Sequence, residues 1–155
     1  MPKIDLAKAP AGSGSRYPAP FDTPCKTRSW HRLGDAVGLS QFGANLVRLP
    51  PGAWSSQRHW HAVEDEFVWV VEGEVILVTN SGDEPMRAGE CAGFKGGDRD
   101  GHCFQNRSKA DAVLLVIGSR DDDDSGDYPD IDMTFGKGRY SGAPVIFRRK
   151  DGTPY

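Results

Sequence analysis

The sequence predicts an all-β sandwich or barrel, on three observations. Glycine (19 residues) and proline (11 residues) are spread along the whole 155-residue chain instead of collecting in one linker. Between them lie short segments rich in β-branched and aromatic residues, which is typical of many short strands joined by turns. No stretch keeps an apolar residue at a 3.6-residue period, so we expect no long helix.

Six segments are expected to form strands, because each is apolar or alternating and each is bounded by turn residues. In chain order they are Leu39–Leu49, Glu66–Val71, Glu74–Thr79, Glu90–Phe94, His102–Asn106 and Val113–Ser119. The turn signals between them are Pro50-Pro51-Gly52, Glu72-Gly73, Asn80-Ser81-Gly82-Asp83 and Gly96-Gly97-Asp98.

Two of these strands are apolar on both faces. After its first residue, Glu66–Val71 has no polar position, and Val113–Ile117 is apolar throughout. A strand of this kind has both faces covered, either by another sheet or by a partner subunit. Two sheets packed face to face, together with a dimer contact, would cover both strands, so the sequence predicts a homodimer.

The chain is long enough for one domain with its own core. Residues 1–20 are predicted to be a flexible lead-in, because they are rich in Ala, Pro, Gly and Ser. Residues 21–155 then form a single domain, in which residues 120–155 are an extension laid over the barrel. The acidic run Asp121–Asp124 does not fit the spacing of a calcium loop, so we interpret residues 121–127 as a solvated, mobile loop.

Composition argues against several classes of protein. With 19 basic and 22 acidic residues, the net charge of −3 offers no basic patch of the kind that binds nucleic acid. No apolar run approaches the ~20 residues needed to span a bilayer, and the N-terminus has no apolar region typical of a secretory signal. The three cysteines lack a C-x-x-C spacing and are odd in number, which favours reduced thiols and a cytoplasmic location.

A candidate metal site begins at His59, His61 and Glu66. Side chains alternate between faces in an extended strand, so the two imidazoles point the same way, about 6–7 Å apart along the strand. They can converge on an ion that lies ~2.1 Å from each nitrogen. After a short turn, Glu66 opens the next strand, from where its carboxylate can reach the same ion. Its neighbours Glu64 and Asp65 are interpreted as turn residues or as groups that orient a ligand.

His102 is the candidate fourth ligand. By alternation His102, Phe104 and Asn106 share one face of their strand, while Cys103 faces the other way as a buried, inert thiol. Three imidazoles and one carboxylate suit one divalent ion of iron, manganese, zinc, nickel, cobalt or copper, and the ligand types alone do not choose among them. The remaining histidine, His31, is expected at the surface or at a strand edge.

The first of these segments resembles the first motif of the cupin superfamily. That motif is a glycine, five residues, H-x-H, three or four residues, a glutamate, six residues and a glycine. Here Gly52 is followed by six residues, then by His59 and His61, by four residues and Glu66, and by six residues and Gly73. One extra residue after Gly52 is the only departure.

The second segment resembles the second cupin motif less closely. Gly89, Gly97, His102 and Asn106 match its glycines, its histidine and its asparagine. Lys95 stands where the motif has proline, and four residues instead of two separate Gly97 from His102. The two motifs together span residues 52–106, about a third of the chain.

This resemblance implies a double-stranded β-helix, or jelly-roll, barrel that holds the metal inside and frequently dimerises. It implies a protein that binds or acts on a small polar or aromatic metabolite in the barrel. The metal would serve dioxygen chemistry, as in a dioxygenase, or would act as a Lewis acid in an isomerase or lyase. A non-catalytic sensor or small-molecule binding module is the alternative, and no residue beyond the metal ligands is predicted to act as an acid or a base.

Overall fold

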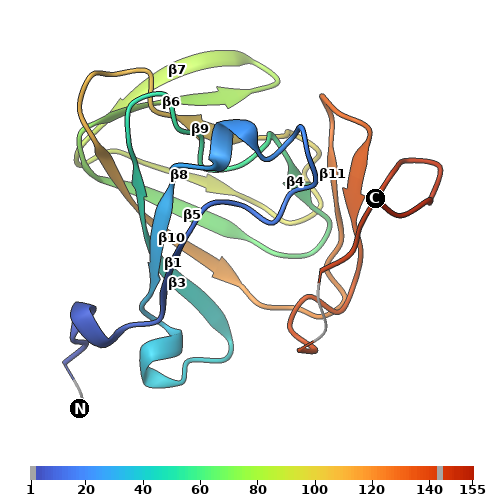
Figure 1. Ribbon diagram of the computed structural model, residues 1–155, viewed down its shortest axis with the longest axis horizontal. Helices are drawn as coiled ribbons and strands as arrows, with labels where there is room; N and C mark the ends of the chain where they lie inside the picture. Colours follow the sequence, from blue (N-terminus) through green and yellow to red (C-terminus); the bar gives the residue numbers. More distant parts are fainter. Residues whose placement is uncertain (1–2, 143–144) are drawn as a thin grey trace.

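Three β-sheets build the molecule, as the computed structural model shows for residues 3–142 and 145–155. The strands are β1 (Ala11–Ser13), β2 (Ser29–Arg32), β3 (Phe42–Leu49), β4 (Trp60–His61), β5 (Glu66–Glu72), β6 (Glu74–Thr79), β7 (Gly82–Arg87), β8 (Cys91–Phe94), β9 (Cys103–Gln105), β10 (Ala112–Ser119), β11 (Gly126–Tyr128), β12 (Met133–Phe135) and β13 (Phe147–Arg148). They form a six-stranded sheet in the order β1-β2-β3-β10-β5-β8, a four-stranded sheet β13-β12-β11-β4 and a three-stranded sheet β7-β6-β9. Figure 1 shows β4 and β11 at the right, with β6 and β7 at the top.

The all-β prediction is confirmed. The helical segments among the described residues are three single turns of 3-10 helix, η1 (Leu6–Lys8), η2 (Thr23–Cys25) and η3 (Asp35–Val37). All six predicted strands are present as β3, β5, β6, β8, β9 and β10, with ends shifted by three residues or fewer. No helix in the described part of the chain is long and apolar enough to cross a membrane.

The main core lies between the six-stranded and three-stranded sheets. It is built from the inward-facing residues of alternating strands, such as Val68 and Val70 on β5, which are fully buried. The buried members of this cluster are Leu49, Ala53, Val68, Val70, Val75, Leu77, Met86, Phe104, Ala112 and Leu114. Burial of this apolar cluster stabilises the two sheets that position the candidate site.

The terminal segments belong to the barrel. Within residues 1–20, predicted to be a flexible lead-in, Ala11–Ser13 instead pairs antiparallel with Ser29–Arg32 in the six-stranded sheet. Tyr17, farther along the same segment, packs on a second hydrophobic cluster that contains Tyr128 and Phe135 of the C-terminal extension. The extension is therefore a wall of the molecule, because its strands β11 and β12 join β4 in one sheet.

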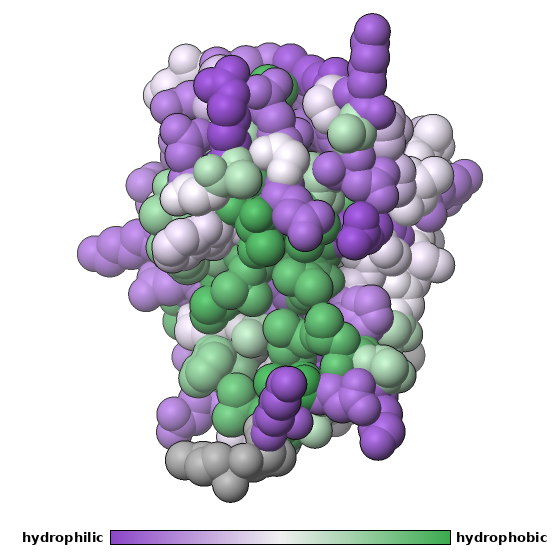
Figure 2. Space-filling view, turned by 90° about the vertical axis from the view of Figure 1, so that its left-hand side faces the viewer, coloured by the Kyte–Doolittle hydropathy of each residue, from purple (hydrophilic) through white to green (hydrophobic). Residues whose placement is uncertain are grey.

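The outer face of β5 is apolar and uncovered in the single chain. Phe67, Trp69 and Val71 are 37%, 44% and 44% exposed, although the sequence predicts both faces of this strand to be covered. Leu115 and Ile117 of β10 pair with Trp69 and Phe67, which widens the apolar surface across two strands. Figure 2 shows a band of hydrophobic residues running down the face of the molecule opposite β11.

Candidate metal centre and cavity

The four predicted metal ligands come from three places in the fold. His61 lies in β4, Glu66 opens β5, and His102 directly precedes β9. His59 and His102 face each other as an isolated antiparallel bridge, in which each backbone amide donates to the other residue's carbonyl oxygen, at 3.1 and 2.8 Å. This bridge brings two segments that are distant in the sequence to one point.

The side chains of these residues converge. Ligand atoms of His59, His61 and Glu66 all lie within 4.8 Å of one another. The carboxylate of Glu66 lies between two imidazoles, because one oxygen is 3.8 Å from Nε2 of His61 and the other is 3.8 Å from Nε2 of His102. The His102 ring centroid is 5.0 Å from that of His59, although His102 is outside the mutually close set of three.

His59 is oriented by the backbone. Its Nδ1 lies 3.0 Å from the carbonyl oxygen of Gln57, which can only accept a hydrogen bond. Nδ1 therefore carries the proton, and Nε2 is left with its lone pair. That tautomer is the one a metal needs when the ion is bound through Nε2.

His61 is oriented by a buried carboxylate from the acidic run. Its Nδ1 donates to Oδ2 of Asp124 at 2.7 Å, while Oδ1 of Asp124 accepts the backbone amides of Val63 and Glu64 at 3.0 and 3.2 Å. Burial acts to raise the pKa of Asp124, but the hydrogen bonds from His61 and these amides outweigh it and lower that pKa. The lone pair of Nε2 on His61 is thus also left toward the cavity.

This corrects the interpretation of residues 121–127 as a solvated loop. Asp121, Asp122 and Asp123 are exposed as predicted, but Asp124 is fully buried. A run of four identical residues carries no spacing signal that separates one member from the others. Only the tertiary position of β11 beside β4 reveals the difference.

His102 is a buried imidazole with unused nitrogens. The side chain is 3% exposed, and neither ring nitrogen has a hydrogen-bond partner in the described part of the chain. The ring stacks on Phe94, with centroids 3.5 Å apart and planes at 4°. A buried polar group without a partner is costly, so an ion bound by Nε2 would satisfy an atom that the protein leaves open.

The protonation states of Glu66 and His59 also favour the binding of a cation. Burial acts to raise the pKa of Glu66, but the neighbouring His102, His59 and His61 rings lower it to about 2. Burial, aided by the His102 and His61 rings, lowers the pKa of His59 to about 3. At neutral pH the cluster therefore presents a carboxylate and a neutral imidazole, which are the forms that bind a metal.

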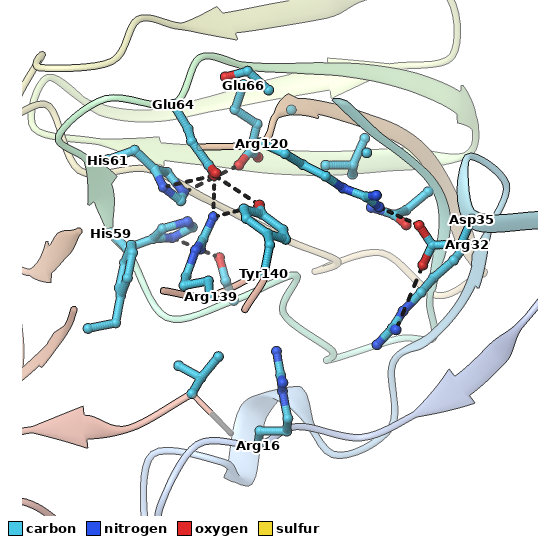
Figure 3. A pocket seen from close by; sticks show the side chains of 18 of the residues that line it. Arg16, Arg32, Asp35, His59, His61, Glu64, Glu66, Arg120, Arg139 and Tyr140 are labelled. Atoms are coloured by element: carbon cyan, nitrogen blue, oxygen red, sulfur yellow. Dashed lines mark hydrogen bonds and ion pairs between the residues drawn. The ribbon is translucent and has the colours of Figure 1, made fainter. Parts of the chain in front are cut away.

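Glu64 lies behind the metal ligands in a second charged cluster. It forms an ion pair with Arg139, accepts a hydrogen bond from the Tyr140 hydroxyl at 3.2 Å, and accepts one from the Asp121 amide at 2.9 Å (Figure 3). Ligand atoms of His61, Glu64 and Asp124 also lie within 4.8 Å of one another, but the Arg139 guanidinium already supplies the positive charge there, 3.6 Å from Asp124. We therefore interpret this charged cluster as a support that holds the candidate ligands in place, and not as a second metal site.

The sequence did not single out Arg139 and Tyr140, because they lie in the C-terminal extension and no motif spacing connects them to His61. Asp65, His31 and Cys103 are not members of the ligand cluster. Asp65 accepts the Gly96 amide at 2.8 Å and so holds a turn, and His31 is a part-buried residue of β2. Cys103 is 1% exposed, and burial raises the pKa of its thiol to about 12.

The ligand cluster opens into a large cavity. The cavity has a volume of about 850 Å³ and is lined by His59, His61 and Glu66 together with residues of β2, β3, β10 and the two terminal segments. Five arginines line it: Arg16, Arg28, Arg32, Arg120 and Arg139. A polar cavity of this size beside a candidate metal site has room for a small, polar metabolite.

Known proteins match the chain over part or all of its length. The profile of the Cupin domain family matches residues 45–118. A crystal structure of a protein named a sugar phosphate isomerase from a cupin superfamily, from Silicibacter pomeroyi, is 49% identical with a TM-score of 0.92, and the match covers 99% of this chain and 96% of that one. A protein named as a candidate sugar phosphate isomerase, from Acidithiobacillus ferrooxidans, is 30% identical with a TM-score of 0.73, covering 81% of this chain and 78% of its own.

A more distant match shows the fold alone. A polyketide cyclase from Streptomyces resistomycificus is 20% identical with a TM-score of 0.60, over 77% of this chain and 79% of that one. The comparison with curated proteins gave no match.

Proposed function

Because this chain belongs to the cupin superfamily, we propose that it is a metal-dependent isomerase of a phosphorylated sugar. The observation that carries the proposal is the cluster of His59, His61 and Glu66 at an arginine-lined cavity, with His102 beside Glu66. The proposal is also supported by the full-length similarity of this chain to a protein that is named a sugar phosphate isomerase.

In this proposal His59, His61, Glu66 and His102 bind one divalent ion. The donor set suits manganese, iron, cobalt, nickel, copper or zinc. Such an ion supplies a Lewis acid that polarises a carbonyl or hydroxyl oxygen of the substrate. The residues behind the ligands keep them in place: Asp124 fixes the ring of His61, and the Gln57 carbonyl fixes the ring of His59.

The isomerisation of a sugar moves a proton between adjacent carbons, so the cavity must offer both a donor and an acceptor. Tyr140 and Glu64 provide this pair at the cavity wall. Burial raises the pKa of Tyr140 to about 12, so its hydroxyl stays protonated. In this proposal the hydroxyl leaves its hydrogen bond to Glu64 and donates instead to a substrate oxygen, which also removes one donor from Oε2 of Glu64. The Glu64 carboxylate beside it is the acceptor.

The test is turnover by the purified, metal-loaded protein on a panel of phosphorylated aldoses and ketoses, followed by proton NMR. We expect interconversion of at least one pair, with loss of activity when a chelator removes the metal and recovery when the metal is restored. His102→Ala should lose most of its bound metal and its activity together. Binding without turnover across the panel would contradict the isomerase and favour a binding module, and oxygen uptake with any substrate would favour a dioxygenase.

We also propose that two copies of the chain pack through the outer face of β5. Three neighbouring outward positions, Phe67, Trp69 and Val71, are apolar and well exposed, and apolar surface of this extent is unusual unless a partner covers it. Two such sheet faces can pack on each other with interdigitating side chains.

The three cysteines are all free thiols, which supports the proposal that the protein works in the cytoplasm.

A further inference from the structure

The arginines that line the cavity differ in whether a nearby carboxylate neutralises their positive charge. Four carboxylates line the cavity with them: Asp35, Glu64, Asp65 and Glu66. Each has a defined partner, because Glu66 faces the histidines, Glu64 pairs with Arg139, and Asp65 accepts a backbone amide. Asp35 is shared by Arg120 and Arg32, the latter at 3.9 Å.

Arg16 and Arg28 are left without a carboxylate among the described residues. The guanidinium of Arg16 has no hydrogen bond or ion pair in that part of the chain, and Figure 3 shows it extending from the N-terminal segment toward the cavity side chains. Arg28 is part-buried and fixed, since its Nε donates to the Gly14 carbonyl at 2.9 Å and its guanidinium lies 5.7 Å from the Trp30 ring centroid.

This local excess of positive charge runs against the charge of the whole protein, which is −3. Uncompensated guanidinium groups in a concave, partly enclosed site attract anions, because the low-dielectric walls strengthen their field. A phosphate group is the anion that best matches two such groups. It carries up to two charges, and its oxygens accept paired hydrogen bonds from the planar guanidinium fork.

We propose that Arg16 and Arg28 form the subsite that binds the phosphate group of the substrate, while the reacting end of the molecule lies at the histidine cluster. This inference rests on the proposed sugar phosphate isomerase and adds the residues that select a phosphorylated substrate. Arg28 is the fixed half of the subsite, and Arg16 closes on the phosphate from the N-terminal segment.

The first test measures anion binding independently of turnover. Inorganic phosphate is titrated by calorimetry into the metal-loaded, full-length protein, into Arg16→Ala and Arg16→Lys, and into the control Arg87→Ala. Arg16 is exposed and makes no contact that folding requires, and Arg87 is an exposed arginine on β7 outside the cavity. We expect phosphate affinity to fall about 10- to 100-fold in Arg16→Ala, to recover partly in Arg16→Lys, and to stay unchanged in Arg87→Ala.

Equal phosphate affinity in the wild-type protein and in Arg16→Ala would overturn the subsite, because the phosphate would then bind at the metal or elsewhere. Gluconate serves as the carboxylate probe in a parallel titration. Binding of gluconate that is tighter than that of phosphate and depends on Arg16 would overturn the assignment of a phosphate group.

The second test compares the phosphorylated and unphosphorylated forms of a sugar that the protein isomerises. Arg16→Ala should lower kcat/KM for the phosphorylated form about 10- to 100-fold, mainly through KM, and leave the unphosphorylated form unaffected. If the protein isomerises sugar phosphates and Arg16→Ala does not change the rates, the subsite is wrong and the proposed function stands. If no sugar phosphate is isomerised but phosphate affinity still depends on Arg16, the proposed function is wrong and the anion site stands.

Discussion

The carboxylate of Asp124 determines which nitrogen of His61 faces the cavity. A buried anion that accepts from Nδ1 holds the ring in one tautomer and one orientation, and it makes Nε2 a stronger donor to a metal. Asp124 is itself held by two backbone amides, so its position does not depend on a flexible partner.

Asp124→Asn is therefore expected to weaken metal affinity about 10- to 100-fold, because the amide removes the negative charge and relaxes the choice of tautomer. The measurement is a competitive metal titration of the purified variant. Asp123→Asn is the matched control, since Asp123 is an exposed neighbour that pairs only with Lys137 among the described residues. Equal losses in the two variants would mean that Asp124 acts only through the general charge of the loop.

The depressed pKa of His59 predicts a pH dependence of the metal-free protein. His59 titrates at about 3 in the folded state against 6.5 ordinarily, so the unfolded chain binds the additional proton between these values. The free energy of unfolding should thus fall as the pH falls from 6.5 toward 3. Glu66 adds a fall of the same sign between 4.5 and about 2.

Urea unfolding followed by tryptophan fluorescence at several pH values measures this dependence. The His59→Gln variant separates the two groups, because the shift of His59 acts mainly between pH 6.5 and 3 and that of Glu66 mainly below pH 4.5. A flatter profile for His59→Gln between pH 6.5 and 4.5 is expected, and an unchanged slope there would show that His59 is not the group responsible.

At the scale of single residues, the sequence predicted the convergence of side chains whose positions are set by spacing along one strand and turn. His59, His61 and Glu66 lie within eight positions of one another, so strand alternation alone places them together. Asp124 and Arg139 reach the same site from distant segments, and tertiary pairing is not encoded in local spacing.

The pairing of β11 with β4 is the element that brings Asp124 to His61. Gly126 is the direct partner of His61 in this ladder, and the Ala62 amide donates to the Ser125 carbonyl at 2.8 Å. A Cβ at position 126 would lie 2.3 Å from the carbonyl oxygen of Trp60 and 2.4 Å from the Phe135 ring. Only glycine lets these strands approach so closely.

Gly126→Ala is accordingly expected to lower the free energy of unfolding by about 2 kcal/mol and to weaken metal binding, since β4 must move away from β11. Gly136→Ala is the matched control, because a Cβ there meets nothing within 4 Å, and its stability should change by less than about 1 kcal/mol. Thermal unfolding and metal titration of both variants provide the comparison. A stable Gly126→Ala with full metal affinity would contradict the close approach.

Among the elements, those with apolar alternation were predictable and those without it were not. β6, for example, begins and ends at the predicted residues because Val75 and Leu77 alternate with less buried positions. β7 has one buried residue, Met86, in a segment that otherwise faces solvent, so it carries no strand pattern and is formed only by pairing with β6. The short strands β11 and β12 likewise depend on β4 and on the aromatic cluster around Tyr128.

At the scale of the whole molecule, the exposed face of β5 predicts a homodimer. Light scattering should give a mass near twice the 16.9 kDa of one chain. Trp69→Glu should yield monomers, because it places a charge in the centre of the proposed contact. Leu6→Glu changes an equally exposed apolar residue in η1, outside this face, and should remain dimeric. A wild-type mass of one chain would refute the dimer.

The candidate ligands His59, His61 and Glu66 are synthesised before Asp124, which sets an order of events during translation. At about 5–20 residues per second, the 58 positions from Glu66 to Asp124 take the ribosome roughly 3 to 12 seconds. Throughout that interval the nascent chain exposes the H-x-H segment without the carboxylate that orients His61. If the cluster binds an ion as proposed, an ion captured in that interval would be held without the support of Asp124, and the complete site would form only after β11 has joined β4.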